Sequence, residues 1–207
     1  MTLFIQIHPE NPQQRLLNQA ASMLRKGGII VYPTDSCYAI GCHIGDKTAS
    51  EKIRRIRQLD ENHDFTLMCS DLAEIGLYAK LDNPSFRLIK NITPGPYTFI
   101  LEATKEVPRR LLTPKRKTIG LRIPDNKIAR DLLAALGEPI ISTTLMLPGD
   151  DYPLTDPYEM RDLLGSQVNM IIDGGYCGLE PTTVVDMLGE VPEVVREGLG
   201  DISVFQN

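Results

Sequence analysis

The sequence predicts an α/β protein, classed as α+β in some schemes, whose single domain holds a twisted, mixed β-sheet flanked by helices. Short apolar runs bounded by glycine and proline alternate with longer stretches whose apolar residues recur at helical spacing. The composition is ordinary for a globular protein, with 42% hydrophobic and 24% charged residues. Because the sequence has no internal repeat and no linker, we expect residues 1–207 to form one domain.

The first part of the chain predicts two strands and two helices. Residues 2–7 alternate loosely between apolar and polar, which favours an edge strand. Leucine and alanine recur at helical spacing over 13–26, and a Gly-Gly pair ends that helix. The apolar run 29–32 predicts a buried strand. A basic amphipathic pattern predicts the second helix over 47–59.

The middle of the chain predicts two more strands and two more helices. The run 65–69 favours a short strand, and helical patterns follow over 71–78 and 84–92. A proline near the start of the second helix suits the first helical turn. A rigid Thr-Pro-Gly-Pro turn then leads into a strand over 97–103. Residues 104–117 are basic and predicted to be irregular.

The last part of the chain continues the alternation, with proline and glycine ending the elements. The predicted helices and strands here cover 126–135 and 158–164, and 118–123, 139–144, 170–173, 182–187 and 193–196. Residues 148–157 are rich in proline and aspartate and predict an exposed loop, with a lid over a cleft as the alternative.

Polar turns follow several of the predicted strands and indicate a ligand site. If these strands are neighbours, their ends converge on one cleft, where hydroxyls and backbone amides suit phosphate and carboxylate oxygens. Arg122 adds a planar, permanently charged fork that grips such groups in two places. The chain has neither a P-loop nor a G-x-G-x-x-G fingerprint. The four turns are Pro33-Thr34-Asp35-Ser36, Arg122-Ile123-Pro124, Ser142-Thr143-Thr144 and Pro181-Thr182-Thr183.

Six short segments, in order along the chain, resemble motifs of the YrdC/YciO family, the threonylcarbamoyl-adenylate synthases, and their details are most similar to the YciO branch. The segments are PTDSCYAIG at 33–41, TPGPYT at 93–98, GLRIP at 120–124, STT at 142–144, PTTVVD at 181–186 and REG at 196–198.

This resemblance implies a YrdC-like fold with a concave, positively charged face. It also implies binding of ATP, with Mg²⁺, and of L-threonine and bicarbonate. These are joined into threonylcarbamoyl-AMP, which serves the modification of adenosine in transfer RNA. Positions matching the family motifs imply catalytic roles for Arg57, Arg122 and Ser142. They imply substrate contacts from Thr34, Tyr38, Thr144, Thr182 and Arg196.

Two departures from the family motifs predict weakened or altered activity. The resemblance implies a K-x-R segment, but here Arg57 stands at the lysine and Leu59 at the arginine. In the STSAN motif, Thr144 stands at the last serine and Met146 at the asparagine. A thioether cannot donate the hydrogen bonds of an amide. Loss of a charged phosphate contact lowers binding by roughly 10- to 150-fold.

The charge distribution suggests a second hypothesis, a binding protein for double-stranded RNA, transfer RNA or ribosomal RNA that kept the fold and lost the chemistry. Residues 47–130 carry a net charge of +7, whereas 131–207 carry −12. Duplex RNA is recognised mainly through its shape and phosphates. The alternative is a solvated loop of ordinary basic residues. The RNA-binding candidates are Arg54, Arg55, Arg109, Arg110, Lys115, Arg116 and Lys117.

The remaining composition indicates a cytoplasmic protein that does not enter membranes. Apolar runs fall far short of the ~20 residues that cross a bilayer, and no secretory leader is evident. The four cysteines show no C-x-x-C spacing, which suits free thiols in a reducing cytosol. Cys37 is more consistent with a packed thiol than with a nucleophile. The three histidines are too scattered for a metal cluster, so we expect no metal site built by the chain.

Overall fold

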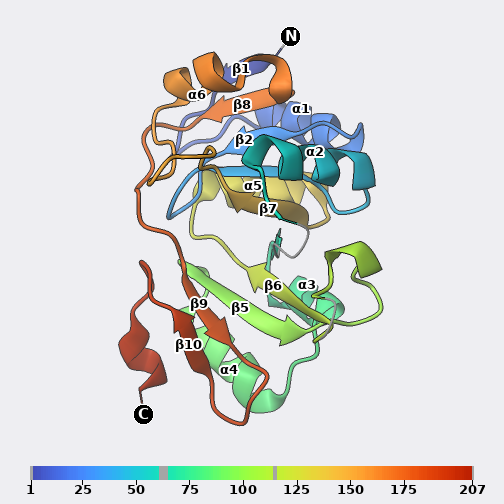
Figure 1. The fold of residues 1–207 in the computed structure, drawn as a ribbon, viewed down its shortest axis with the longest axis vertical. Coiled ribbons are helices and arrows are strands. Elements are labelled where there is room, and N and C mark those ends of the chain that lie inside the picture. The colour runs from blue at the N-terminus through green and yellow to red at the C-terminus, as the bar shows by residue number, and fades with distance from the viewer. Residues whose placement is uncertain (1, 61–64, 114–115, 207) are drawn as a thin grey trace.

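The computed structural model describes residues 2–60, 65–113 and 116–206, and its strands form one sheet (Figure 1). The order across the sheet is β1-β8-β2-β3-β7-β4-β6-β5-β9-β10, with both parallel and antiparallel neighbours. The strands are β1 (Leu3–Gln6), β2 (Ile30–Tyr32), β3 (Ala39–His43), β4 (Thr66–Met68), β5 (Tyr97–Glu102), β6 (Thr118–Arg122), β7 (Ile140–Thr144), β8 (Met170–Asp173), β9 (Thr183–Asp186) and β10 (Glu193–Arg196).

Six α-helices and three short 3₁₀ helices complete the described fold. Most α-helices begin at an Asp or Asn whose side chain accepts a hydrogen bond from a backbone N–H of the first turn, as Asp46 does from Ala49. The helices are α1 (Gln14–Arg25), α2 (Lys47–Arg57), α3 (Leu72–Tyr78), α4 (Asn83–Ile92), η1 (Arg109–Leu111), α5 (Lys127–Leu136), α6 (Pro157–Leu164), η2 (Gly165–Gln167) and η3 (Ile202–Phe205).

One half of the sheet is covered on both faces, and we call it the covered half: β1, β8, β2, β3 and β7. Along β2, Ile30 and Tyr32 pack on the side of α1 and α5, whereas Val31 packs on the side of α2 and α6. In Figure 1 this half lies at the top, with α2 in front of it. Because both faces are buried, its central strands are apolar at nearly every position.

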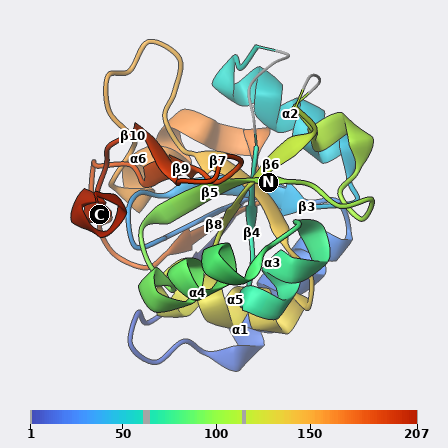
Figure 2. The same cartoon turned by 90° about the horizontal axis from the view of Figure 1, so that it is seen from below.

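The other half, which we call the cavity half, consists of β4, β6, β5, β9 and β10 and has helices on one face. Figures 1 and 2 show α3 and α4 against that face. Ile75 of α3 and Ile89 of α4 pack there with Phe99 and Leu121 of the sheet. Helices α3 and α4 do not cover the opposite face of these strands.

The predicted fold class is confirmed, with two local differences. Helix α2 ends at Arg57 rather than at residue 59, because Gln58 adopts a left-handed conformation with φ of 49°. Strand β3 was not predicted, because its sequence AIGCH lacks a run of β-branched residues. Residues 2–7 do provide a strand at the edge of the sheet. Within the described ranges, no helix is long and apolar enough to span a bilayer.

Candidate functional site

A cavity of about 750 Å³ lies between the two halves of the sheet. Its walls come from seven strands (β3, β4, β5, β6, β7, β9 and β10), from the turn at 36–38, from the end of α2, and from the loops at 146–153 and 179–182. The size suits a nucleotide-sized ligand. Segments far apart in the sequence therefore converge on one hollow, as the polar strand ends predicted.

The floor of the cavity follows the alternation of the strands. In β6, Thr118, Gly120 and Arg122 line the cavity, whereas the intervening Ile119 and Leu121 lie in the core. The strands β4 and β5 follow the same alternation, with Thr66 and Met68, and Thr98 and Ile100, lining the cavity. At the end of β7, three consecutive residues line it: Ser142, Thr143 and Thr144. The floor is consequently rich in hydroxyl groups, and its underside is apolar.

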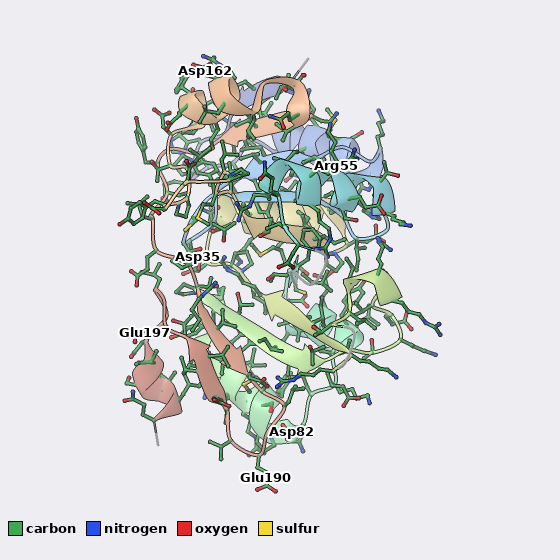
Figure 3. The ribbon with its side chains drawn as sticks, in the orientation of Figure 1. Asp35, Arg55, Asp82, Asp162, Glu190 and Glu197 are labelled. Atoms are coloured by element: carbon green, nitrogen blue, oxygen red, sulfur yellow. The ribbon has the colours of Figure 1, made fainter. Side chains whose placement is uncertain are left out.

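Arg122 is the most deeply placed charge at this floor and forms an ion pair with Asp35. Its terminal nitrogen also donates to the Thr34 hydroxyl over 3.3 Å. Figure 3 shows Asp35 at the level where the two halves of the molecule meet. The pair is incomplete, because Asp35 Oδ2 and Arg122 Nε are buried and have no hydrogen-bond partner.

Arg57, at the end of α2, is a second buried cation that lines the cavity. Its Nε is also buried without a partner, and desolvation lowers the pKa of its guanidinium. Within the described residues, these three atoms of Asp35, Arg57 and Arg122 are the buried side-chain nitrogens and oxygens that lack partners. Buried polar groups in native proteins are nearly always satisfied by protein, water or ligand. Their concentration here marks the cavity as a place for polar ligands.

Hydroxyl groups from opposite sides face the same space. Ser142 of β7 is buried and hydrogen-bonds with the Tyr32 hydroxyl over 2.5 Å. Thr182 shares a hydrogen bond of 2.9 Å with Thr98. Arg196 of β10 donates to the Thr182 carbonyl over 2.9 Å, and desolvation lowers the pKa of its guanidinium. Thr144 also lines the cavity.

Two of the predicted substrate-binding residues use their hydroxyls within the protein. Thr34 is buried, and its hydroxyl donates to the Cys37 carbonyl over 2.6 Å. Tyr38 lines the cavity, but its hydroxyl donates to the Gly175 carbonyl and accepts from the Gly174 N–H. These contacts hold the turn and the segment after β8 together behind the cavity wall. Of the eight residues predicted from the motifs, seven line the cavity and Thr34 lies behind its wall.

The sequence did not single out the acidic and aromatic residues around the cavity. Asp151 and Tyr152 belong to the exposed loop at 148–157, and Leu179 and Glu180 to the loop before β9. All four are exposed and line the cavity. The lid alternative for the loop at 148–157 had pointed toward Asp151 and Tyr152, whereas no signal had pointed toward Leu179 and Glu180.

Three of the seven basic residues predicted to contact RNA make contacts within the protein. Arg54 donates to the Asp60 carbonyl and lies over the Phe65 ring. Arg110 donates to the Ile44 carbonyl over 2.6 Å, and Arg116 pairs with Asp186 over 2.9 Å. The other candidates, Arg55, Arg109 and Lys117, are exposed, whereas Lys115 lies outside the described residues.

The thiols next to the cavity are protonated at neutral pH. Cys37 donates to the Glu180 carbonyl and Cys177 to the Thr34 carbonyl. Burial raises the pKa of Cys37, and it raises the pKa of Cys177 to about 12. A thiolate nucleophile therefore does not form readily at either position.

Relatives of this chain share its sequence over nearly its full length. The uncharacterized protein YciO of Escherichia coli K12 is 62% identical over 205 residues, which are 99% of this chain and 100% of that protein. The crystal structure of E. coli YciO matches with a TM-score of 0.95 and 61% identity, covering 99% of this chain and 100% of that one.

More distant relatives have names that describe a reaction or a ligand. A threonylcarbamoyl-AMP synthase of Cellvibrio japonicus is 29% identical over 183 residues, covering 87% of this chain and 94% of that protein. The crystal structure of P. abyssi Sua5 complexed with L-threonine matches with a TM-score of 0.87 and 24% identity, covering 95% of this chain and 58% of that one. The Sua5/YciO/YrdC family model, described as telomere recombination, matches residues 22–198. The chain belongs to this family.

Proposed function

We propose that the cavity binds ATP and L-threonine, and that the chain joins them with bicarbonate to form threonylcarbamoyl-AMP at a reduced rate. The observation that carries this proposal is a set of buried atoms without partners: Arg57 Nε and Arg122 Nε belong to residues that line one cavity rich in hydroxyls, and Asp35 Oδ2 belongs to the ion-pair partner of Arg122. The named synthase of C. japonicus and the threonine complex of P. abyssi Sua5 support the choice of substrates.

The reaction requires mainly positioning and charge stabilisation. The threonine amine and bicarbonate combine into a carbamate with loss of water, and a carbamate oxygen then attacks the α-phosphorus of ATP while pyrophosphate leaves. Arg57 and Arg122 are placed to balance the negative charge on the carboxylate and phosphates. Ser142 and Thr182 add hydroxyl donors. Met146 lines the same cavity and cannot donate a hydrogen bond, which is consistent with a reduced rate.

The proposal includes Mg²⁺ as a companion of ATP. Among the described residues there is no group of three or more His, Cys, Asp or Glu side chains that could hold a metal. Asp151 and Glu180 nevertheless line the cavity with carboxylate oxygens, the hard donors that Mg²⁺ prefers, so the residues fit an ion bound mostly by phosphates and water. Such an ion would neutralise phosphate charge.

The test is calorimetric titration of ATP and of L-threonine, alone and together, followed by assay of threonylcarbamoyl-AMP and pyrophosphate with Mg²⁺ and bicarbonate. We expect each substrate to tighten binding of the other. Changing Arg57→Met should weaken ATP binding by about 10- to 150-fold, because a charged hydrogen bond is lost. Arg87→Met, on the exposed surface of α4, is the matched control. Absence of binding by the wild-type chain would contradict the proposal.

One observation favours a second function, the binding of duplex RNA. The bond from Arg110 to Ile44 joins η1 to the loop before α2, and Figures 1 and 2 place both segments on one side of the molecule. Arg55 of α2 and Arg109 of η1 are exposed on these two elements. Binding through several phosphates must weaken steeply as salt rises. A fluorescence titration of a duplex RNA at increasing KCl tests this, and a flat response to salt would exclude it.

A further inference from the structure

Tyr32 is a fully buried residue that reaches the cavity only through another side chain. It ends β2, and its ring spans β3 to place the hydroxyl 2.5 Å from the hydroxyl of Ser142 on β7. Ser142 in turn lines the cavity. Tyr32 can therefore influence the cavity only through Ser142. No motif in the sequence assigned Tyr32 a role.

Gly41 of β3 leaves the space that this contact needs. It lies between Ile30 of β2 and Ser142 of β7 in the register of the sheet. A Cβ atom at Gly41 would lie 2.8 Å from Ser142 Oγ and 2.6 Å from a methyl carbon of Ile140. Any larger residue would push the serine hydroxyl away. Strand β3, which was not predicted, therefore lies between β2 and β7 in the sheet and, at Gly41, leaves room for the two hydroxyls to meet.

The direction of the hydrogen bond follows from what each hydroxyl can reach. Tyr32 makes this hydrogen bond only, within the part of the chain that the structure describes. If Tyr32 accepted it, the phenol proton would be buried without a partner, at a cost of about 1–3 kcal/mol. Ser142 borders the cavity, where its own proton can find an acceptor. Desolvation raises the pKa of Tyr32, so the phenol keeps its proton at neutral pH.

We propose that Tyr32 is a positioning residue: by donating to Ser142 Oγ, it commits the serine hydroxyl to donate its proton into the cavity. A hydroxyl held in this way favours an oxygen acceptor such as a phosphate oxygen and disfavours a donor such as an amine. The proposal rests on the proposed function only for the choice of ATP as the oxyanion.

The binding test is a double-mutant cycle. Tyr32→Phe removes one oxygen and retains the ring, and we expect it to weaken binding of Mg²⁺-ATP by about 2- to 13-fold. In a Ser142→Ala background, the same change should have no further effect, because the group through which Tyr32 acts is gone. Tyr97→Phe is the matched control, since it also removes a phenol hydrogen bond, here to the Asp201 carbonyl and away from Ser142.

A Raman measurement tests the direction of the bond without any ligand. The intensity ratio of the tyrosine Fermi doublet reports whether a phenol donates or accepts. The difference spectrum between the wild type and Ser142→Ala should show the loss of one donating tyrosine. A spectrum showing an accepting phenol would overturn the proposal. This measurement stands even if Tyr32→Phe fails to fold.

The outcomes separate this inference from the proposed function. The same cycle is run with pyrophosphate, so a chain that binds pyrophosphate and not ATP contradicts the proposed function while still testing Tyr32. Equal losses from Tyr32→Phe with and without Ser142 would show a purely structural role and overturn the inference. Unchanged binding of both probes by Tyr32→Phe would also overturn it. A wild-type chain that binds neither probe would overturn both proposals.

Discussion

The covered half and the cavity half belong to one sheet, yet their strands have different compositions. In β8 of the covered half, every residue is buried, and the first three are apolar. In β6 of the cavity half, every residue is also buried, but apolar residues alternate with Thr118, Gly120 and Arg122. Burial alone therefore does not distinguish a core face from a ligand face. The difference lies in whether alternate positions carry methyl groups or hydroxyl, glycine and guanidinium groups.

The comparison teaches that helices determine what a strand face becomes. In the covered half, both faces of β2 and β8 pack against helices, so an unpaired polar side chain on those faces would lose its water without gaining a partner. In the cavity half, α3 and α4 cover one face and leave the other to the cavity. Four predictions test this contrast, taken here from the largest expected effect to the smallest.

The largest effect is expected where charge is buried at the joint between the halves. Arg122→Met leaves the Asp35 carboxylate without its ion-pair partner, so the free energy of unfolding should fall by about 3–5 kcal/mol. Adding Asp35→Asn should restore most of this loss, because the charge is then gone. Urea denaturation of the single and double variants measures both effects, and equal stability of all three chains would contradict the ion pair.

The next effect compares two isoleucines in the two halves. Ile172 of β8 is completely buried in the covered half, so Ile172→Ala should lower the free energy of unfolding by about 2–5 kcal/mol. Ile100 of β5 borders the cavity, so Ile100→Ala should cost much less, since it enlarges an existing space. Thermal and urea unfolding of the pair provide the comparison. Similar losses would show that the two faces do not differ.

A smaller effect on stability is expected when a methyl group is added to the floor of the cavity. In Gly120→Ala, the new Cβ would lie 3.3 Å from Thr66 Oγ1 and 3.4 Å from a methyl carbon of Thr98. The neighbours must move slightly, so we expect a change in unfolding free energy below about 1 kcal/mol, together with weaker binding of ATP. Calorimetric titration and urea denaturation of the same preparation separate the two quantities. A large loss of stability without a change in binding would place Gly120 in the core.

The smallest effect concerns thiol reactivity and leaves stability unchanged at pH 8. Burial raises the pKa of Cys42 in the covered half and of Cys177 beside the cavity to about 12 in each case. At pH 8 both should therefore react with a disulfide reagent at least ~100-fold more slowly than in denaturant. As pH rises toward 12, the thiolate fraction should grow about tenfold per unit. Fast reaction of either native thiol at pH 8 would contradict this burial.

Most helices and strands of this fold were predictable from the sequence because each is a local pattern. The six helices were expected from apolar spacing and end signals, and each is found within one or two residues of the expected bounds. Strand β3 escaped prediction because AIGCH lacks a run of β-branched residues, and its Gly41 is required by a packing constraint against Ser142 rather than by strand propensity. The order of the strands also could not be inferred, since it depends on contacts between distant segments.

Residues of the candidate site were predictable where the residue type itself indicates a ligand-binding group, such as a guanidinium or a hydroxyl at a strand end. Arg122 and Ser142 follow or belong to strands with polar ends, and the sequence indicated their convergence. The partnership of Asp35 with Arg122 was not inferred, because a carboxylate in a polar turn looks like an ordinary turn residue. The contact of Tyr32 with Ser142 was not predicted either, since an aromatic residue at the end of an apolar run normally indicates core packing.

Alternation along the floor strands separates the positions that hold the scaffold from those that face a ligand. Positions that face the core, such as Leu121, maintain the scaffold, whereas their immediate neighbours line the cavity and face any bound ligand. Mutations at the neighbouring positions can therefore change ligand preference while most of the scaffold's stability is conserved. A library randomised at Thr66, Thr98 and Thr118 should yield mostly folded proteins with divergent specificities, and the same library at Leu67, Phe99 and Ile119 should yield mostly unfolded ones.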